Sequence, residues 1–275
     1  FWDTPLGKGR PGWHIECSAM STKYLGKTFD IHTGGVDLIF PHHENEIAQT
    51  EAWTDRPFVR YWLHNNHLIV DGKKMSKSLG NFFTLRDLLD KGHEPLAIRY
   101  FLLAGYYRSK LNLTDKALNS ASKTVRRIKG FVQSMAEHES GNSRPNRLID
   151  DIITQAKRGF EESMDDDLGI PDALSSIFSL MSRVNRERDA GRLSTDDASK
   201  VYGFMIDIDR VLGLGLDTVP VSSDIPDEIM LMAEEREELR RKRDFSGADR
   251  IRNEIRKRGF VIEDTPNGPV IRRAS

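Results

Sequence analysis

The fold of this 275-residue chain is decided by the stretch Phe29-Asp30-Ile31-His32-Thr33-Gly34-Gly35 and by the helix and strand that follow it. Its first four residues predict a short β-strand, and Thr33-Gly34-Gly35 is expected to end that strand. Pro41 fits the first turn of a helix, where its missing N–H costs nothing. Tyr61 to Val70 predicts another strand. This succession indicates part of a doubly wound α/β sheet, whose ligands lie at the carboxyl ends of the strands.

Helical periodicity replaces this pattern from Thr84 onward. Apolar side chains recur there at spacings of three and four, which is typical of helices in a bundle. Thr114 and Ser194 are suited to cap two of these helices. Met181 and Met205 lie on the apolar stripes and are interpreted as core residues. The helices are predicted to begin at 95, to run over about 115–138 and about 148–164, and to begin again at 171 and 195.

The C-terminal fifth of the chain has a different pattern. It follows a linker rich in Gly, Pro and Ser at 214–224, and an earlier linker lies at 141–145. Two helices and a strand pair around a Pro-Asn-Gly turn are predicted there, over 227–242, 246–257, 260–262 and 269–271.

Composition limits the classes of protein to which the chain can belong. Lys and Arg number 41 and Asp and Glu 42, so a net charge of −1 gives the whole molecule no bulk attraction to nucleic acid. Any RNA contact must therefore be local. Basic residues do concentrate after Leu239, although an acidic cluster precedes them, and a solvated helix would show the same pattern. The single cysteine, Cys17, excludes an internal disulfide.

Nothing in the sequence resembles a membrane or targeting segment. No apolar run approaches the roughly 20 residues that span a bilayer, and the opening is rich in Gly and Pro. We therefore expect a soluble, cytoplasmic protein. Because the chain opens with Phe1 inside an apparent loop, we also expect it to be a fragment.

The loop Lys74-Met75-Ser76-Lys77-Ser78 is suited to a polyphosphate. Each Lys is a compact point charge and each Ser is a hydrogen-bond donor. The alternative is an ordinary Lys- and Ser-rich surface turn. The first interpretation predicts a nucleotide site beside the α/β sheet.

A second set of side chains offers metal ligands. Cys17, His42, His43, Glu44 and Glu46 combine one soft donor with several borderline ones, which is the mixture that zinc accepts. On a helix that begins near Pro41, residues four apart share a face, so His42 and Glu46 converge while His43 points elsewhere. Cys17, on another element, could complete the set. Each histidine could instead be a solvated or hydrogen-bonded side chain.

Three ordered motifs resemble those of the cysteinyl-tRNA synthetase family. The Lys74–Ser78 loop, extended by Ser78-Leu79-Gly80-Asn81, resembles the second nucleotide-binding motif of class I aminoacyl-tRNA synthetases. The other two resemble segments that bind zinc in this family, and the resemblance extends over essentially the whole chain. They are Gly12-Trp13-His14-Ile15-Glu16-Cys17-Ser18-Ala19-Met20 and the stretch from His32-Thr33-Gly34-Gly35-Val36-Asp37-Leu38 through Phe40-Pro41-His42-His43-Glu44-Asn45-Glu46-Ile47-Ala48-Gln49.

The resemblance implies a reaction and a set of site residues. Cysteine would be activated by ATP, with Mg²⁺, to cysteinyl-adenylate and then transferred to tRNA(Cys), and Zn²⁺ would select the substrate thiolate over serine. The implied zinc ligands are Cys17, His42 and Glu46, with Trp13 beside the thiol. His32 and Asp37 would lie near the charged groups of the amino acid, and Gly34 and Gly35 near the adenylate. Lys74, Met75, Ser76, Lys77 and Ser78 would bind ATP, with Lys74 and Lys77 acting on the departing pyrophosphate.

The resemblance also implies missing parts. The family's first ATP motif and its fourth zinc ligand, a cysteine, have no counterpart here, so the isolated 275 residues are expected to lack full activity. In the C-terminal part, the residues aligned with anticodon-reading positions are Arg240, Phe245, Asp249, Arg252 and Asp264. Ile271 stands where the family often has Trp. Surface ion pairs on helices are the alternative for these charged residues.

The predicted fold class is α/β plus all-α, divided into three domains. Residues 1–83 form the second half of a Rossmann-type catalytic domain, 84–215 a stem-contact region and helical bundle, and 216–275 a small α+β anticodon-binding module. We expect a monomer. Two alternatives stay open: a ligase that joins cysteine to an amino-sugar inositol, and a non-catalytic RNA-binding zinc module. The basic C-terminal helices disfavour the first, and the Lys74–Ser78 loop disfavours the second.

Overall fold

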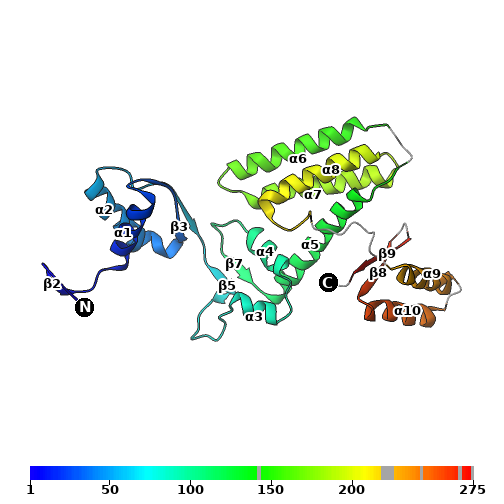
Figure 1. Cartoon of the computed structure of the whole chain (residues 1–275), viewed down its shortest axis with the longest axis horizontal. Coiled ribbons are helices and arrows are strands. Elements are labelled where there is room, and N and C mark those ends of the chain that lie inside the picture. Colours follow the sequence, from blue (N-terminus) through cyan, green and yellow to red (C-terminus); the bar gives the residue numbers. More distant parts are fainter. Residues whose placement is uncertain (141–143, 218–225, 242–243, 266–267, 274–275) are drawn as a thin grey trace.

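The structure is a computed structural model that describes residues 1–275 except 141–143, 218–225, 242–243, 266–267 and 274–275; side chains at 227, 263–265, 268–270 and 272–273 are also outside the description. It is rich in helix, with small sheets (Figure 1). None of the helices in the described ranges is both long and apolar enough to span a bilayer.

The N-terminal unit contains a two-stranded parallel sheet. Strand β3 (Phe29–Gly35) pairs with β4 (Val59–Asn65) from Phe29 opposite Val59 to Gly35 opposite Asn65. The prediction that Thr33-Gly34-Gly35 ends the first strand is therefore wrong, because pairing with β4 continues through these residues. The other elements of this unit are β1 (Trp2–Thr4), β2 (Gly7–Gly9), α1 (Trp13–Leu25), η1 (Val36–Leu38), η2 (Ile39–His43) and α2 (Glu44–Thr54).

The predicted strand from Tyr61 to Val70 is two strands with different partners. After β4, strand β5 (Leu68–Val70) pairs with β6 (Lys73–Lys74) and with β7 (Leu111–Leu113). Asp71 and Gly72 join β5 to β6 with φ values of 47° and 76°, the positive angles of a tight hairpin turn. The prediction that the chain stays helical after Thr84 is wrong at β7, because its pairing with β5 is long-range.

The helical region forms a bundle with one continuous core. Its elements are α3 (Leu85–Asp90), α4 (Pro95–Leu103), α5 (Asp115–Ala136), α6 (Arg147–Asp165), α7 (Ile170–Asp189) and α8 (Thr195–Leu212), and the last four run side by side in Figure 1. The predicted caps are confirmed: Thr114 Oγ1 accepts the Ala117 N–H at 3.0 Å and Ser194 Oγ the Asp197 N–H at 3.1 Å. Met181 and Met205 are buried in the core, as predicted.

The same core also includes Val70 from β5, and Leu68 and Met75 pack against it. The sheet that precedes the Lys74–Ser78 loop is thus attached to the bundle by packing as well as by the chain. The division at residues 83 and 215 stays a prediction.

The C-terminal module has its own small core. Helices α9 (Asp227–Arg241) and α10 (Phe245–Lys257) pack with the antiparallel pair β8 (Phe260–Thr265) and β9 (Gly268–Arg273). Ile229, Ile255 and Phe260 are buried there. The two helices and the strand pair agree with the prediction, although the predicted turn residues Pro266 and Asn267 lie outside the described residues.

Candidate functional site

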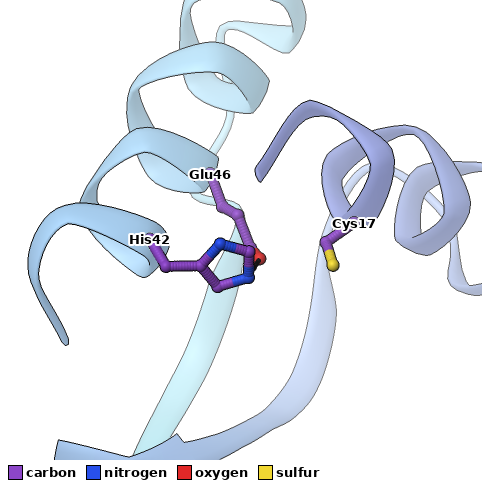
Figure 2. A group of neighbouring side chains, drawn as sticks. All are labelled: Cys17, His42 and Glu46. Carbon is purple, nitrogen blue, oxygen red and sulfur yellow. Dashed lines mark ion pairs between the residues drawn. The ribbon is translucent and has the colours of Figure 1, made fainter. Parts of the chain in front are cut away.

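Cys17, His42 and Glu46 converge between α1 and α2. Cys17 lies on α1, His42 lies in η2, and Glu46 lies in the first turn of α2. One potential ligand atom from each lies within 4.8 Å of the others, and His42 Nε2 is 2.7 Å from Glu46 Oε1. Figure 2 shows the imidazole and carboxylate together, with Cys17 on α1 beside them. His42 and Glu46 therefore share a face, as their spacing predicts.

Burial sets the electrostatics of this group. Glu46 is fully buried, and burial raises the pKa of its carboxyl to about 7. Burial is also the main cause that raises the pKa of the Cys17 thiol and lowers that of His42. Among the described residues, His42 Nδ1 and both Glu46 oxygens make no hydrogen bond, although His42 Nε2 and His32 Nε2 lie 2.7 Å and 3.1 Å from the two oxygens. A thiol, a neutral imidazole and an unsatisfied carboxylate fit a zinc ion, which would compensate the buried negative charge.

The raised pKa of Glu46 predicts a specific dependence of stability on pH. The folded chain holds the Glu46 proton more tightly than the unfolded chain, so this group's contribution to stability is complete below about pH 4.5 and is lost as pH rises through about 7. Without metal, Glu46→Gln should therefore raise the melting temperature by a few degrees at pH 8 and by much less at pH 4.5. Melting curves in a chelator at both pH values measure the difference.

The exposed Glu44 provides the matched control for that experiment. Glu44→Gln removes the same charge two residues away and should leave the melting temperature unchanged at both pH values. Equal effects of the two substitutions at pH 8 would contradict the assigned burial of the Glu46 charge.

His43 was expected to point away from this group, and that expectation is wrong. Ligand atoms of His32, His43 and Glu46 lie within 4.8 Å of one another, and His32 Nε2 is 3.1 Å from Glu46 Oε2. The backbone at His43 is helical, but Glu46 has ligand oxygens on two sides. Its Oε1 lies 2.7 Å from His42 Nε2, and its Oε2 lies 3.1 Å from His32 Nε2, whose ring centre is 4.8 Å from that of His43.

His64 was not identified from the sequence. It lies on β4 opposite Gly34 of β3, and its Nε2 is 2.8 Å from His43 Nδ1. Burial, followed by the neighbouring imidazoles, lowers the pKa of His43 to about 4. The strand register could have identified His64, because parallel pairing places His64 beside β3, the strand that carries His32.

Of the predicted substrate-contact residues, Trp13 and Gly34 lie against the histidine rings, whereas Asp37 is exposed. The Trp13 ring centre is 4.2 Å from that of His42. A Cβ on Gly34 would lie 2.7 Å from His43 Cε1, so glycine permits the close approach of that ring. Asp37 is exposed, and a Cβ on Gly35 would lie 2.4 Å from its Oδ1.

The Lys74–Ser78 loop is held by a residue that received no separate role from the sequence. Asn81 Oδ1 accepts the Ser76 N–H at 2.9 Å, and Asn81 Nδ2 donates to the Lys74 carbonyl at 3.0 Å. The side chains of Lys74 and Lys77 are exposed, and Lys77 Nζ lies 5.5 Å from the centre of the Phe82 ring. The loop backbone is therefore fixed while its charged groups face outward.

The predicted RNA-contact residues lie in the C-terminal module. Phe245 begins α10 and is 60% exposed, and Asp249 and Arg252 are exposed on the same helix. Arg240 lies near the end of α9, with Nε 3.9 Å from Glu237 Oε1. Asp264 belongs to β8, but its side chain is outside the described residues.

Comparison with known proteins identifies both large regions. Residues 1–123 match the model of the class I (C) tRNA synthetase catalytic domain, and residues 159–217 match the DALR domain. Curated cysteine–tRNA ligases of Chlamydia muridarum and Carboxydothermus hydrogenoformans are 45% and 43% identical over 99% and 98% of the chain. A LeuRS of Agrobacterium radiobacter K84, solved as a ternary complex, shares the fold with a TM-score of 0.54 and 16% identity over 69% of this chain and 26% of that one.

Residues 1–123 thus match part of a class I aminoacyl-tRNA synthetase. The chain spans 58% of the length of each of these two ligases. The similarity to cysteine–tRNA ligases over nearly the whole chain, together with these two matched domains, supports a fragment of a cysteinyl-tRNA synthetase.

Proposed function

We propose that the protein containing this chain joins cysteine to tRNA(Cys) at the expense of ATP. The observation that carries the proposal is the convergence of Cys17, His42 and Glu46, a sulfur, nitrogen and oxygen donor set. It suits a metal that distinguishes a thiolate from a hydroxyl, a choice that a hydrophobic pocket makes poorly. The relatives named cysteine–tRNA ligase support the same substrate.

Zinc would be held by Cys17, His42 and Glu46, and when bound it supplies a soft Lewis acid that prefers the substrate sulfur. The surrounding residues would orient the amino acid. Trp13 lies against the His42 ring and would border the thiol, while His32 and Asp37 would lie near the ammonium and carboxylate groups. Gly34 and Gly35 would let the backbone approach the adenylate.

The Lys74–Ser78 loop would bind the triphosphate. In the first step the cysteine carboxylate attacks the α-phosphorus of ATP, an acyl-phosphate bond forms, and the bond to pyrophosphate breaks. Lys74 and Lys77 would neutralise the negative charge that develops on pyrophosphate, and Ser76, Ser78 and the Met75 backbone would help to position it. Mg²⁺ would accompany ATP. In the second step a terminal ribose hydroxyl of the tRNA takes the cysteinyl group and AMP leaves.

We assign residues 1–83 to the second half of the Rossmann-type catalytic domain. Residues 84–215, the stem-contact region and bundle, and residues 216–275, the anticodon module, would bind tRNA. The exposed Phe245 ring is suited to stack on a splayed base. Arg240, Asp249, Arg252 and Asp264 would contact base edges. We propose a cytoplasmic monomer.

A charging assay on the full-length protein tests this function. With ATP and cysteine, we expect cysteine to be transferred to tRNA(Cys), with serine rejected and glucosaminyl-inositol not used as an acceptor. Acceptance of the amino sugar alone would contradict the proposal in favour of thiol biosynthesis. Binding of tRNA without any adenylate formation would instead support a non-catalytic module.

A further inference from the structure

One carboxylate joins the helical bundle to the segment between α4 and β7. Asp167, in the turn between α6 and α7, accepts the Tyr107 hydroxyl at 2.6 Å and Arg108 Nη2 at 3.0 Å through Oδ1. Its Oδ2 accepts the Tyr106 hydroxyl and Arg108 Nε. These hydrogen bonds, that of Arg108 foremost, hold the pKa of Asp167 well below its usual range. We call this arrangement the Asp167 clasp.

The backbone at the clasp is specialised. Asp167 and Leu168 are consecutive left-handed residues, with φ values of 54° and 56°. Aspartate tolerates this region, but leucine rarely adopts it. The turn is closed by the Gly169 N–H, which donates to the Ser163 carbonyl at 2.9 Å. Such strain persists only where the surroundings fix the backbone, so the position of Asp167 is well determined.

The segment held by Asp167 in turn holds the connection between β4 and β5. The Asn66 N–H donates to the Tyr107 carbonyl at 2.7 Å, and Asn66 Nδ2 donates to the Arg108 carbonyl at 3.0 Å. The Leu111 N–H donates to the His67 carbonyl at 3.2 Å. Main-chain and side-chain hydrogen bonds thus join residues 66–67 to the segment that Asp167 fixes.

This connection is the joint between the two halves of the candidate site. Strand β4 ends just before it and carries His64, whereas β5 follows it and leads through the hairpin to Lys74. His64 lies two residues before Asn66, whose side chain donates to the Arg108 carbonyl, so the clasp segment is bonded next to the strand that carries His64.

Apolar packing holds the β5 side of this joint, because Val70 belongs to the bundle core and Leu68 packs against it. A cavity of about 370 Å³ lies beside the joint, lined by residues of the joint, of the held segment and of the bundle, including Asn66, Tyr107 and Leu168. Because side chains do not fill this space, polar contacts supply the constraint on the side of the joint that faces the cavity.

We propose that Asp167 is a positioning residue that sets the geometry of the β4–β5 connection from the helical bundle. It thereby fixes the position of the His32, His43 and His64 group relative to the Lys74–Ser78 loop. Asp167 is not among the residues to which we assign contacts with cysteine or ATP. Its effect on catalysis rests on the proposed function, whereas its effect on the joint does not.

Hydrogen–deuterium exchange in the full-length protein tests the joint directly. Asp167→Asn keeps the shape but loses the charge, and it should speed exchange of the amides at 66–69 and 107–111 by about tenfold. Tyr107→Phe removes a single hydrogen bond and should give a smaller change in the same amides. Asp166→Asn, the same charge change at the preceding exposed residue, should have no effect. Unchanged exchange in both Asp167→Asn and Tyr107→Phe would overturn the positioning role.

Steady-state kinetics of cysteine-dependent ATP–pyrophosphate exchange test the consequence. Asp167→Asn should lower kcat about ten- to a hundredfold through misplacement of the two halves of the site, with KM for cysteine within about twofold. A merely structural loss would reduce the titrated number of active sites and leave kcat per site unchanged, and that result would overturn the proposal. Should the unsubstituted protein form no adenylate, the proposed function fails, while the exchange experiment still judges the clasp.

Discussion

Replacing both Lys74 and Lys77 with alanine in the full-length protein is expected to lower the rate of cysteinyl-adenylate formation by about 100- to 1000-fold, the usual loss when a charge-stabilising group is removed. Both ammonium groups are exposed on a loop whose backbone Asn81 fixes, so they can meet a triphosphate without rearrangement of that backbone. Cysteine-dependent ATP–pyrophosphate exchange measures the rate. Affinity for tRNA(Cys), measured by filter binding, should change by less than about twofold, because the proposed anticodon contacts are in another module.

Lys73→Ala is the matched control for this pair. Lys73 is the neighbouring exposed lysine on β6, so its loss changes the net charge without touching the loop. We expect near-normal adenylate formation in this variant. Equal rates in Lys73→Ala and in the double substitution would remove the assignment of the loop to ATP. A parallel loss of tRNA binding in the double variant would show that the loop serves RNA instead.

The elements that local sequence specifies were predicted well. Thr114 and Ser194 each precede an apolar stripe, and a helix begins directly after each of them. By contrast, Leu111–Leu113 becomes a strand only because β5 lies beside it, a contact about 40 residues away in sequence that periodicity cannot reveal. The same limit explains β3, whose Gly34 and Gly35 stay extended through pairing with β4.

The candidate site, too, could be predicted from the sequence only in part. His42 and Glu46 could be paired from their spacing, because a helical turn brings residues four apart together. His43 could not be placed, since it is grouped with Glu46 and with His32 of β3, a distant neighbour in sequence that helical spacing does not reveal. His64 reaches His43 through strand register, and Asp167 reaches Tyr107 from the turn between α6 and α7, about 60 residues away in sequence. Neither belongs to a motif that the sequence makes visible.

Loss of the thiol or of the buried carboxylate should have the largest effect on metal binding. Cys17→Ser and Glu46→Gln are each expected to weaken zinc affinity by at least about 100-fold, since even residues that only support a ligand contribute about 10–100-fold. Competition with a chromophoric chelator measures the affinity in the full-length protein. With Co²⁺ in place of zinc, Cys17→Ser should also weaken the thiolate-to-metal charge-transfer absorption, whereas Glu46→Gln should weaken binding without removing this absorption.

Glu44→Gln distinguishes coordination from simple electrostatic attraction. Glu44 is exposed and lies two residues from His42, so its carboxylate adds negative charge near the site but is not among the grouped ligand atoms. If the ion is bound by the converging atoms of Cys17, His42 and Glu46, zinc affinity in Glu44→Gln should stay within about twofold of the unsubstituted protein, because a screened surface charge contributes little. A loss as large as that of Glu46→Gln would mean that net charge attracts the metal, and the assignment of Glu46 as a ligand would then be wrong.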